Sequence, residues 1–195
     1  MTFPPSDPDE RPSLLRGQRA AFDVPQDVAH FNTAKLSPML HAVRAAGNEA
    51  LERRSQPWTI TAQDWFAGVE RARGMFAQLV GGEPDGVALI PATSYGFAVA
   101  ARNVEVSSGE RILVLAEECP SGAYTWQAVA RHTGAELLTV YKDAGRRDTG
   151  QTWTEAILAA LDERVALVSV PNVHLTDGAL IDLLAVAAMS SASDW

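Results

Sequence analysis

The sequence predicts an α/β protein whose mainly parallel sheet is covered by helices on both faces. Four short runs are mainly apolar at their centres and lack strict polar alternation, which is typical of parallel strands buried on both faces. They are "GVALIPA", "RILVLA", "ELLTVYKD" and "VALVSVPNV", which begin at residues 86, 111, 136 and 165. Segments with apolar residues at helical spacing separate these runs, and an alternation of strands and helices favours a parallel sheet.

Composition limits the class of protein. The chain has 195 residues, a length that suits one domain or one domain and part of a second. Its formal net charge of −8 argues against a nucleic-acid partner. No apolar stretch approaches the roughly 20 residues that a membrane helix needs, so no membrane association is expected. A single cysteine, Cys119, cannot form an internal disulfide, and a cytoplasmic location is therefore expected.

The first part of the chain has a helical pattern. Residues 1–12 are rich in proline and acidic residues and are expected to form a disordered tail. Residues 13–84 are expected to form an N-terminal helical segment. Its first helix is predicted to begin at Ser37, as N-cap, with Pro38 at the first helical position. A second helix is predicted over 61–81, where apolar residues recur at helical spacing.

The second part, residues 85–195, is expected to form the α/β domain. Its predicted helices follow the four apolar runs in order and cover 94–104, 121–134, 152–163 and a last one from about 179. In open parallel sheets ligands bind beyond the carboxyl ends of the strands. Three strand ends are therefore candidates for a site: "PATSYG", "AEECPSG" and "PNVHLTDG".

Two hydroxyl residues, Thr93 and Ser94, stand between the first apolar run and the helix that follows it. A helix N-terminus offers unpaired N–H groups and a partial positive charge, and hydroxyls can add further bonds to a phosphate. The alternative is that Thr93 or Ser94 is simply the N-cap of the helix and binds nothing.

The last apolar run is followed by a dense set of polar residues: Asn172, His174, Thr176 and Asp177. Clusters of this kind at strand ends are often functional sites. The alternative is a hydrogen-bonded loop before a helix, with His174 satisfied by the backbone.

Other kinds of site have little support. Cys119 follows the second run without a nucleophile motif, so it is interpreted as a small buried apolar residue. The four histidines show no spacing that indicates a metal site. The glycine motifs for dinucleotides and for nucleoside triphosphates are both missing, which disfavours an oxidoreductase.

Four stretches, taken in order, resemble the class V aminotransferase family of pyridoxal-phosphate enzymes, which have fold type I. The stretches are "HFNTAKLSPMLHAVRAAG", "PATSYGFAVAARN", "LAEECPSGAYTW" and "VPNVHLTDGALIDL", and the similarity runs from about 26 to 189. Cysteine desulfurases, kynureninase and isopenicillin-N-epimerase-like proteins belong to this family. A chance match of an unrelated α/β domain is the remaining alternative.

The resemblance implies that the bound phosphate is that of pyridoxal 5′-phosphate. Ala92, Thr93 and Ser94 match the turn that holds the cofactor's phosphate in this family. Cys119 stands where relatives place a histidine or phenylalanine that stacks on the cofactor's ring, and a cysteine there would weaken or lose that stacking.

Further residues are matched less closely. Asn172 or His174 stands where relatives place a polar group near the cofactor's 3-oxygen, and the resemblance allows either. Asn32 and Thr33 match a stretch that approaches the amino-acid substrate in relatives.

The family's chemistry also needs a lysine that holds the cofactor covalently and an acid that pairs with its ring nitrogen. In relatives both lie on later strands. The two lysines here, Lys35 and Lys142, do not stand at the matching position. The resemblance therefore implies the N-terminal half of an incomplete fold type I large domain, inactive by itself, whose complete form is a homodimer acting on an amino acid. The alternative is a non-catalytic phosphate-binding module that partners a second half or a full-length relative.

The resemblance also implies an order of strands. Only the second and third apolar runs would be direct neighbours, and strands made later would separate the other two from them. Open strand edges cost pairing and promote aggregation. The isolated chain is therefore expected to be unstable, or to fold only by rearranging.

Overall fold

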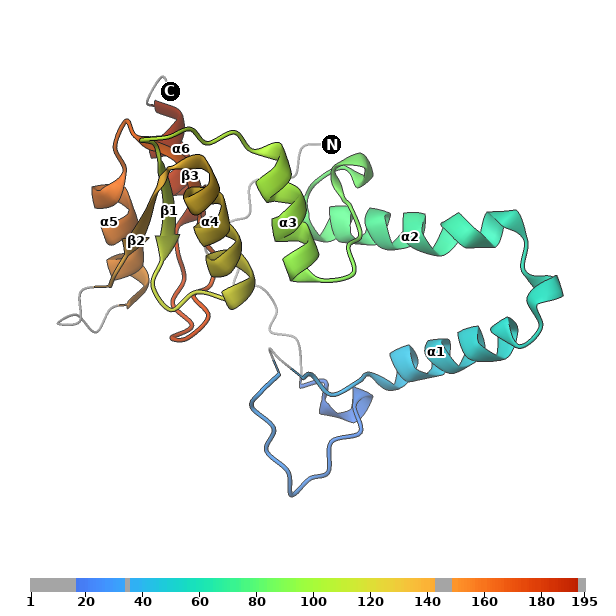
Figure 1. Ribbon diagram of the computed structural model, residues 1–195. Coiled ribbons are helices and arrows are strands. Elements are labelled where there is room, and N and C mark those ends of the chain that lie inside the picture. The colour runs from blue at the N-terminus through green and yellow to red at the C-terminus, as the bar shows by residue number, and fades with distance from the viewer. Residues whose placement is uncertain (1–16, 34–35, 143–148, 193–195) are drawn as a thin grey trace. The chain divides into compact units, whose positions relative to one another are not determined.

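The computed structural model describes residues 17–33, 36–142 and 149–192 (Figure 1). The predicted tail, residues 1–12, lies outside the described residues. The chain forms two compact units, Met1–Ala88 and Leu89–Trp195.

The unit Met1–Ala88 is helical. Its two long helices are α1, His41–Arg54, and α2, Ala62–Val80, and three short 3-10 turns accompany them: η1, Arg19–Ala21, η2, Pro57–Thr59, and η3, Pro84–Gly86. Helix α1 begins later than predicted, with Leu40 rather than Ser37 as its N-cap. Leu40 forms an antiparallel bridge with Phe22, which holds its backbone extended and delays the helix.

The start of α2 agrees with the predicted helix. The Thr61 backbone N–H donates to the Asp64 carboxylate at 2.8 Å, as in a capping box. Arg53 of α1 binds the same carboxylate at 2.6 Å. Bonds from Arg53 and Thr61 hold the pKa of Asp64 well below its usual range.

The unit Leu89–Trp195 is α/β, as the sequence predicts. Its strands are β1, Arg111–Leu115, β2, Glu136–Val140, and β3, Val165–Ser169, and they form a parallel sheet in the order β2-β1-β3. Its helices are α3, Thr93–Asn103, α4, Pro120–Thr133, α5, Thr149–Ala160, and α6, Leu183–Ala192. The pairing of β1 with β3 shifts register between Arg111 and Ile112, which leaves a bulge at the start of β3.

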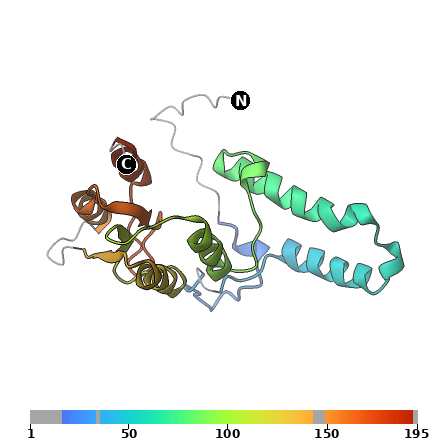
Figure 2. The same cartoon turned by 45° about the horizontal axis from the view of Figure 1, so that its top comes forward.

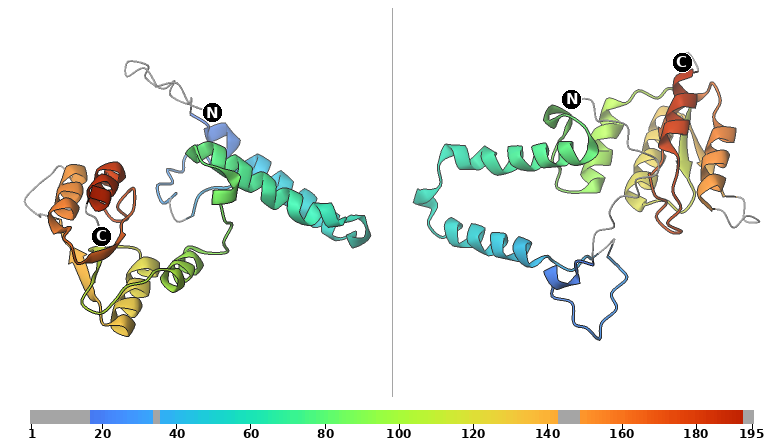
Figure 3. Two further views of the ribbon diagram at one scale, coloured as in Figure 1. Left: turned by 90° about the horizontal axis from the view of Figure 1, so that it is seen from above. Right: turned by 180° about the vertical axis from the view of Figure 1, so that it is seen from behind.

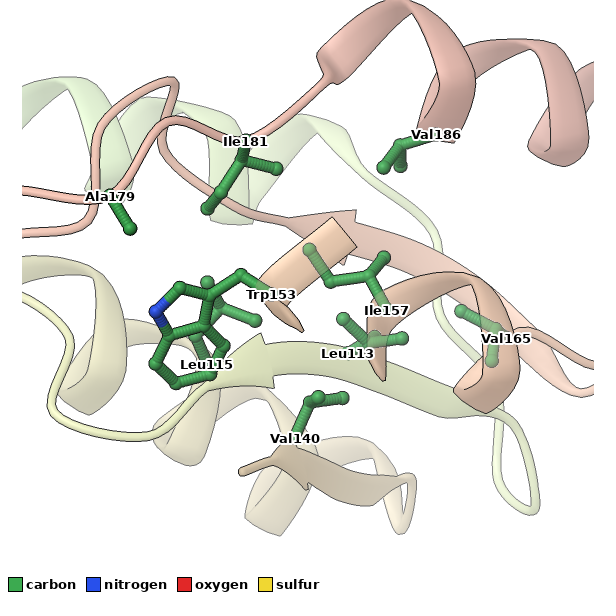
Figure 4. Close-up of a cluster of buried hydrophobic side chains, with 9 residues drawn as sticks. All are labelled: Leu113, Leu115, Val140, Trp153, Ile157, Val165, Ala179, Ile181 and Val186. Atoms are coloured by element: carbon green, nitrogen blue, oxygen red, sulfur yellow. The ribbon is translucent and has the colours of Figure 1, made fainter. Parts of the chain in front are cut away.

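Helices cover both faces of the sheet (Figures 2 and 3). One face of β1 presents Leu113 and Leu115 to Trp153 and Ile157 of α5 and to the α6 side, as Figure 4 shows. The other face presents Ile112 and Val114 to α4 and to the flank of α3. Since β1 is central, four of its five residues are buried.

Two expectations about the sheet are wrong. The run that begins at residue 86 forms no strand, because among the described residues nothing pairs with it, and Leu89 and Ile90 are about half exposed. The prediction that a missing strand separates β3 from β1 is also wrong, because β3 pairs directly with β1. The residues of β1 are apolar on both faces, which suits a central strand with a neighbour on each side.

Candidate functional site

The carboxyl ends of the three strands and the first turns of α3 and α4 lie at the same end of the unit (Figure 1). The three stretches singled out in the sequence lie here, at the start of α3, between β1 and α4, and after β3. Ligands of open parallel sheets bind at this end.

Helix α3 starts without a side-chain cap. Its N-cap is Ala92, whose extended backbone has φ −161° and ψ 154° and whose methyl group cannot accept a hydrogen bond. The alternative in which Thr93 or Ser94 caps the helix is therefore wrong. The Ala92 carbonyl accepts bonds from the N–H groups of Tyr95 and Gly96 at 3.0 and 3.2 Å.

The first two N–H groups of α3, those of Thr93 and Ser94, have no intrahelical acceptor. Within the described part of the chain, both hydroxyls also lack a hydrogen-bond partner. Four donors consequently gather at an uncapped helix start, where the helix dipole is positive. This set of donors is suited to a phosphate.

A hollow of about 360 Å³ lies beside this helix start. Its lining is mostly apolar and consists of Ile90, Thr93, Gly96, Phe97, Ala100 and Trp126. A Cβ atom on Gly96 would lie only 2.7 Å from Cδ1 of Ile90, so glycine permits the close approach of the segment before α3.

Helix α4 starts at Cys119, its N-cap, whose carbonyl accepts bonds from Gly122 at 3.0 Å and Ala123 at 3.1 Å. The thiol is free and only partly buried, so it is more exposed than the buried apolar residue that the sequence predicts. A Cβ atom on Gly122 would lie 2.9 Å from the Phe97 ring, so glycine also permits α3 to pack tightly against α4.

The residues after β3 fold back on themselves. Val173 and Leu180 form an antiparallel bridge, and the Asn172 carbonyl accepts a bond from the Ile181 N–H at 3.0 Å. We name the residues 172–181 the β3 hairpin. The Asn172 side chain is exposed and, within the ranges that the structure describes, its amide has no partner.

His174 is oriented differently. Its side chain is only 1% exposed. Its Nε2 lies 3.0 Å from the carbonyl oxygen of Ala116, and its Nδ1 lies 3.1 Å from Oδ1 of Asp177. Of the two candidates for the cofactor's 3-oxygen, Asn172 therefore has free polar atoms, whereas both ring nitrogens of His174 are already bonded within the protein.

The Asp177 carboxylate accepts hydrogen bonds from several donors. Lys142, just after β2, binds its Oδ2 at 2.7 Å, and the Trp153 indole N–H donates to the same oxygen at 3.0 Å. The Ala179 N–H donates to Oδ1 at 3.0 Å. Burial opposes ionisation of Asp177, but these bonds and the charge of His174 outweigh it and hold the pKa well below its usual range.

Lys142 and Trp153 were not among the predicted site residues. The sequence shows that Lys142 follows a strand, but not which loop its ammonium group reaches. Trp153 stacks on His174 with ring centroids 4.3 Å apart, and this contact depends on where α5 packs against the sheet.

One further acid lies in the turn after β1. Burial raises the pKa of Glu118, and its Oε1 is buried without a hydrogen-bond partner among the described residues. The preceding residue, Glu117, has a positive φ of 58°.

Asn32 and Thr33 belong to the unit Met1–Ala88 and are both exposed. The Asn32 carbonyl accepts a bond from the Leu36 N–H at 3.1 Å. Thr33 lines a hollow of about 190 Å³ together with Arg19, Phe22, Val24, His30, Ser37 and Pro38.

Across the ranges 17–33, 36–142 and 149–192, no group of three or more histidine, cysteine, aspartate or glutamate side chains could hold a metal ion. In the same ranges, no helix has both the length and the apolar character needed to cross a membrane.

The family model for class V aminotransferases matches residues 48–194, more than half of the chain. The chain belongs to the class V aminotransferase family. The resemblance seen in the sequence is thereby confirmed.

Two curated relatives agree with this assignment. An uncharacterised aminotransferase, YcbU, of Bacillus subtilis is 26% identical over 130 residues, which cover 65% of this chain and 33% of the relative. Kynureninase of Geobacillus thermodenitrificans is 31% identical over 128 residues, which cover 65% of this chain and 30% of the relative. The chain thus spans about a third of the length of these relatives.

Solved structures share the fold. A mutant of C-DES, with glycine covalently linked to its pyridoxal-phosphate cofactor, matches with a TM-score of 0.78 at 15% identity, over 89% of this chain and 45% of that chain. Cysteine desulfurase CsdA of Escherichia coli matches with a TM-score of 0.70 at 17% identity, over 89% and 45% of the two chains. Fold type I is confirmed, and the matched part is less than half of either neighbour.

Proposed function

We propose that the uncapped start of α3 binds the phosphate of pyridoxal 5′-phosphate, and that this chain contributes one part of a class V cofactor site. The main support for this proposal is that the hydroxyls of Thr93 and Ser94 are both free at a helix start whose N-cap is Ala92. The C-DES neighbour, which has the same fold, holds pyridoxal phosphate.

Each residue of the site would then contact a different part of the cofactor. The hydroxyls and N–H groups of Thr93 and Ser94 would bind the phosphate. Cys119 would contact the ring, and its small side chain would give less stacking than an aromatic residue. The free amide of Asn172 would donate to the cofactor's 3-oxygen, because the ring nitrogens of His174 are already bonded within the protein.

When bound, pyridoxal phosphate supplies an electron sink for chemistry at an amino acid. We propose that the complete enzyme acts on an amino acid as a homodimer, and that Asn32 and Thr33 approach the substrate. This stretch of sequence is proposed to be inactive by itself. Lys142 is bound to Asp177 at 2.7 Å and does not serve as the covalent lysine.

A non-catalytic role is the second candidate. The free donors of α3 would bind a phosphate whether or not a lysine is present, so the chain could serve as a phosphate-binding partner of a full-length relative. Both candidates share the α3 site and differ only in whether chemistry follows binding.

The test is a titration of the protein with pyridoxal phosphate, followed by the ligand's fluorescence, with inorganic phosphate as competitor. The double variant Thr93→Val, Ser94→Ala should weaken binding by about tenfold or more, since bonds to a charged group contribute roughly 1.5–3 kcal/mol. The matched control is Ser107→Ala, which removes an exposed hydroxyl near the opposite end of the sheet.

The same titration with pyridoxal, which lacks the phosphate, distinguishes a phosphate site from general adsorption. Equal affinity for pyridoxal and pyridoxal phosphate, or equal binding by the double variant, would show that α3 is not the phosphate site.

A further inference from the structure

A single polar cluster joins the carboxyl ends of all three strands. We name it the carboxyl-end cluster; it comprises the Ala116 carbonyl and Glu117 after β1, Lys142 after β2, Thr176, Asp177 and His174 after β3, and Trp153 of α5. Its bonds join residues that are 35, 58 and 59 positions apart in the sequence. The cluster therefore fixes the spacing of loops that the sheet alone does not determine.

His174 is the centre of this cluster. It is almost completely buried, and Trp153 covers one face of its ring. Its Nε2 faces the Ala116 carbonyl, which only accepts hydrogen bonds, so this nitrogen donates. Its Nδ1 lies 3.1 Å from the Asp177 carboxylate and 3.2 Å from the Thr176 hydroxyl. The ring therefore connects the turn after β1 to the β3 hairpin through both of its nitrogens.

The turn that His174 holds has an unfavourable backbone conformation. Glu117 has φ +58°, which is uncommon for a residue other than glycine. Two bonds from the β3 hairpin brace it: His174 to the carbonyl of Ala116, and the Thr176 hydroxyl to the Glu117 carboxylate at 3.0 Å. Such a conformation persists only when its surroundings hold it.

We infer that His174 is a positioning residue, which braces the 116–119 turn against the β3 hairpin and so sets the spacing between Cys119 and Asn172. This inference rests on the proposed function, because those two residues are the proposed contacts of the cofactor's ring. The phosphate side of the site, at the start of α3, has no bond to the cluster among the described residues.

The first experiment is hydrogen–deuterium exchange of the protein and of His174→Phe, which keeps a ring beside Trp153 but loses both bonds. Exchange should rise in peptides covering the 116–123 turn as well as in the β3 hairpin. The control His132→Gln changes an exposed histidine of α4 and should leave both regions unaltered. A rise confined to the hairpin would overturn the inference, since His174 would then act only on its own loop.

The second experiment compares two ligands. His174→Phe should weaken binding of pyridoxal phosphate severalfold while binding of inorganic phosphate stays unchanged, because only the ring side is displaced. Equal weakening of both ligands would indicate a purely structural role and overturn the inference. If the unaltered protein binds neither ligand, the proposed function fails, and the exchange experiment still decides whether His174 braces the turn.

A milder variant covers the case in which His174→Phe does not fold. Thr176→Val keeps His174 and its bond to Ala116, and it removes the hydroxyl that bonds Glu117 at 3.0 Å and contacts Nδ1 of His174 at 3.2 Å. It should raise exchange in the 116–123 turn to a smaller degree and weaken pyridoxal phosphate more than inorganic phosphate. Unchanged exchange in that turn would contradict the bracing role.

Discussion

The two ends of the same sheet are held by clusters of different construction. At the amino end, Arg111 binds Glu136 at 3.0 Å and also Asp162, while Arg164 donates to the Gly109 carbonyl at 2.8 Å and to Glu136 at 3.2 Å. The side chains there are 22–46% exposed. At the carboxyl end, Asp177 and Lys142 are 21% and 27% exposed, but His174 is only 1% exposed.

The difference lies in redundancy. Two arginines converge on Glu136 at the amino end, so either one can be lost while the other still pairs with it. At the carboxyl end, Asp177 alone accepts the bonds of Lys142, Trp153 and the Ala179 N–H. The amino end thus resembles an ordinary exposed ion-pair network, whereas the carboxyl end holds its loops in one arrangement.

Removal of Asp177 should produce the largest loss of stability. Asp177→Ala removes the acceptor of the buried Trp153 indole N–H and of the partly exposed Lys142, and also the carboxylate beside His174, so the free energy of unfolding should fall by about 3 kcal/mol. Urea unfolding followed by tryptophan fluorescence measures this, because Trp126 and Trp153, the buried tryptophans of the described residues, both lie in the α/β unit. A loss below about 1 kcal/mol would show that the cluster is no more important than a surface network.

Acid should remove the contribution that the ionised Asp177 carboxylate makes to the free energy of unfolding. The folded pKa of Asp177 lies below its ordinary value of 3.8, so its contribution is complete above that value and is lost as pH falls through the folded pKa. The difference in unfolding free energy between the unaltered protein and Asp177→Asn should therefore be largest near neutral pH and narrow below 3.8. Urea unfolding of both proteins over this pH range measures it, and a constant difference would contradict the assignment.

The smallest effect is expected at the amino end. Arg111→Met removes pairs with Glu136 and Asp162 but leaves Arg164 bound to Glu136, so the free energy of unfolding should fall by about 1 kcal/mol or less. The same urea assay gives the value. A loss equal to that of Asp177→Ala would remove the contrast between the two ends of the sheet.

Much of the α/β unit could be predicted from apolar runs. The runs that became β1, β2 and β3 are continuous, and this pattern reports burial on both faces. The pattern does not report which strands are neighbours. The predicted order rests on the family resemblance, and its separation of β1 from β3 is wrong, because the two strands pair directly. The prediction of a strand just before Ala92 is wrong for a related reason. An apolar run becomes a strand only where another strand pairs with it.

The candidate site was predictable only in part. The density of polar residues from Asn172 to Asp177 pointed to the β3 hairpin, and hydroxyls after an apolar run pointed to the start of α3. Lys142 and Trp153 carry no local signal, since their contacts arise from packing between distant segments. The roles of Thr93, Ser94, Cys119 and Asn172 in cofactor binding remain predictions.

The bulge at the start of β3 has a consequence for how the domain tolerates insertions and deletions. Arg111 pairs with Val165 but Ile112 pairs with Leu167, so one residue of β3 is left out of register at the amino end. Such a bulge absorbs an extra residue without disturbing the pairing that follows. Changes in chain length before β3 can therefore be taken up at this point, and the residues that lead into the β3 hairpin keep their alignment with β1.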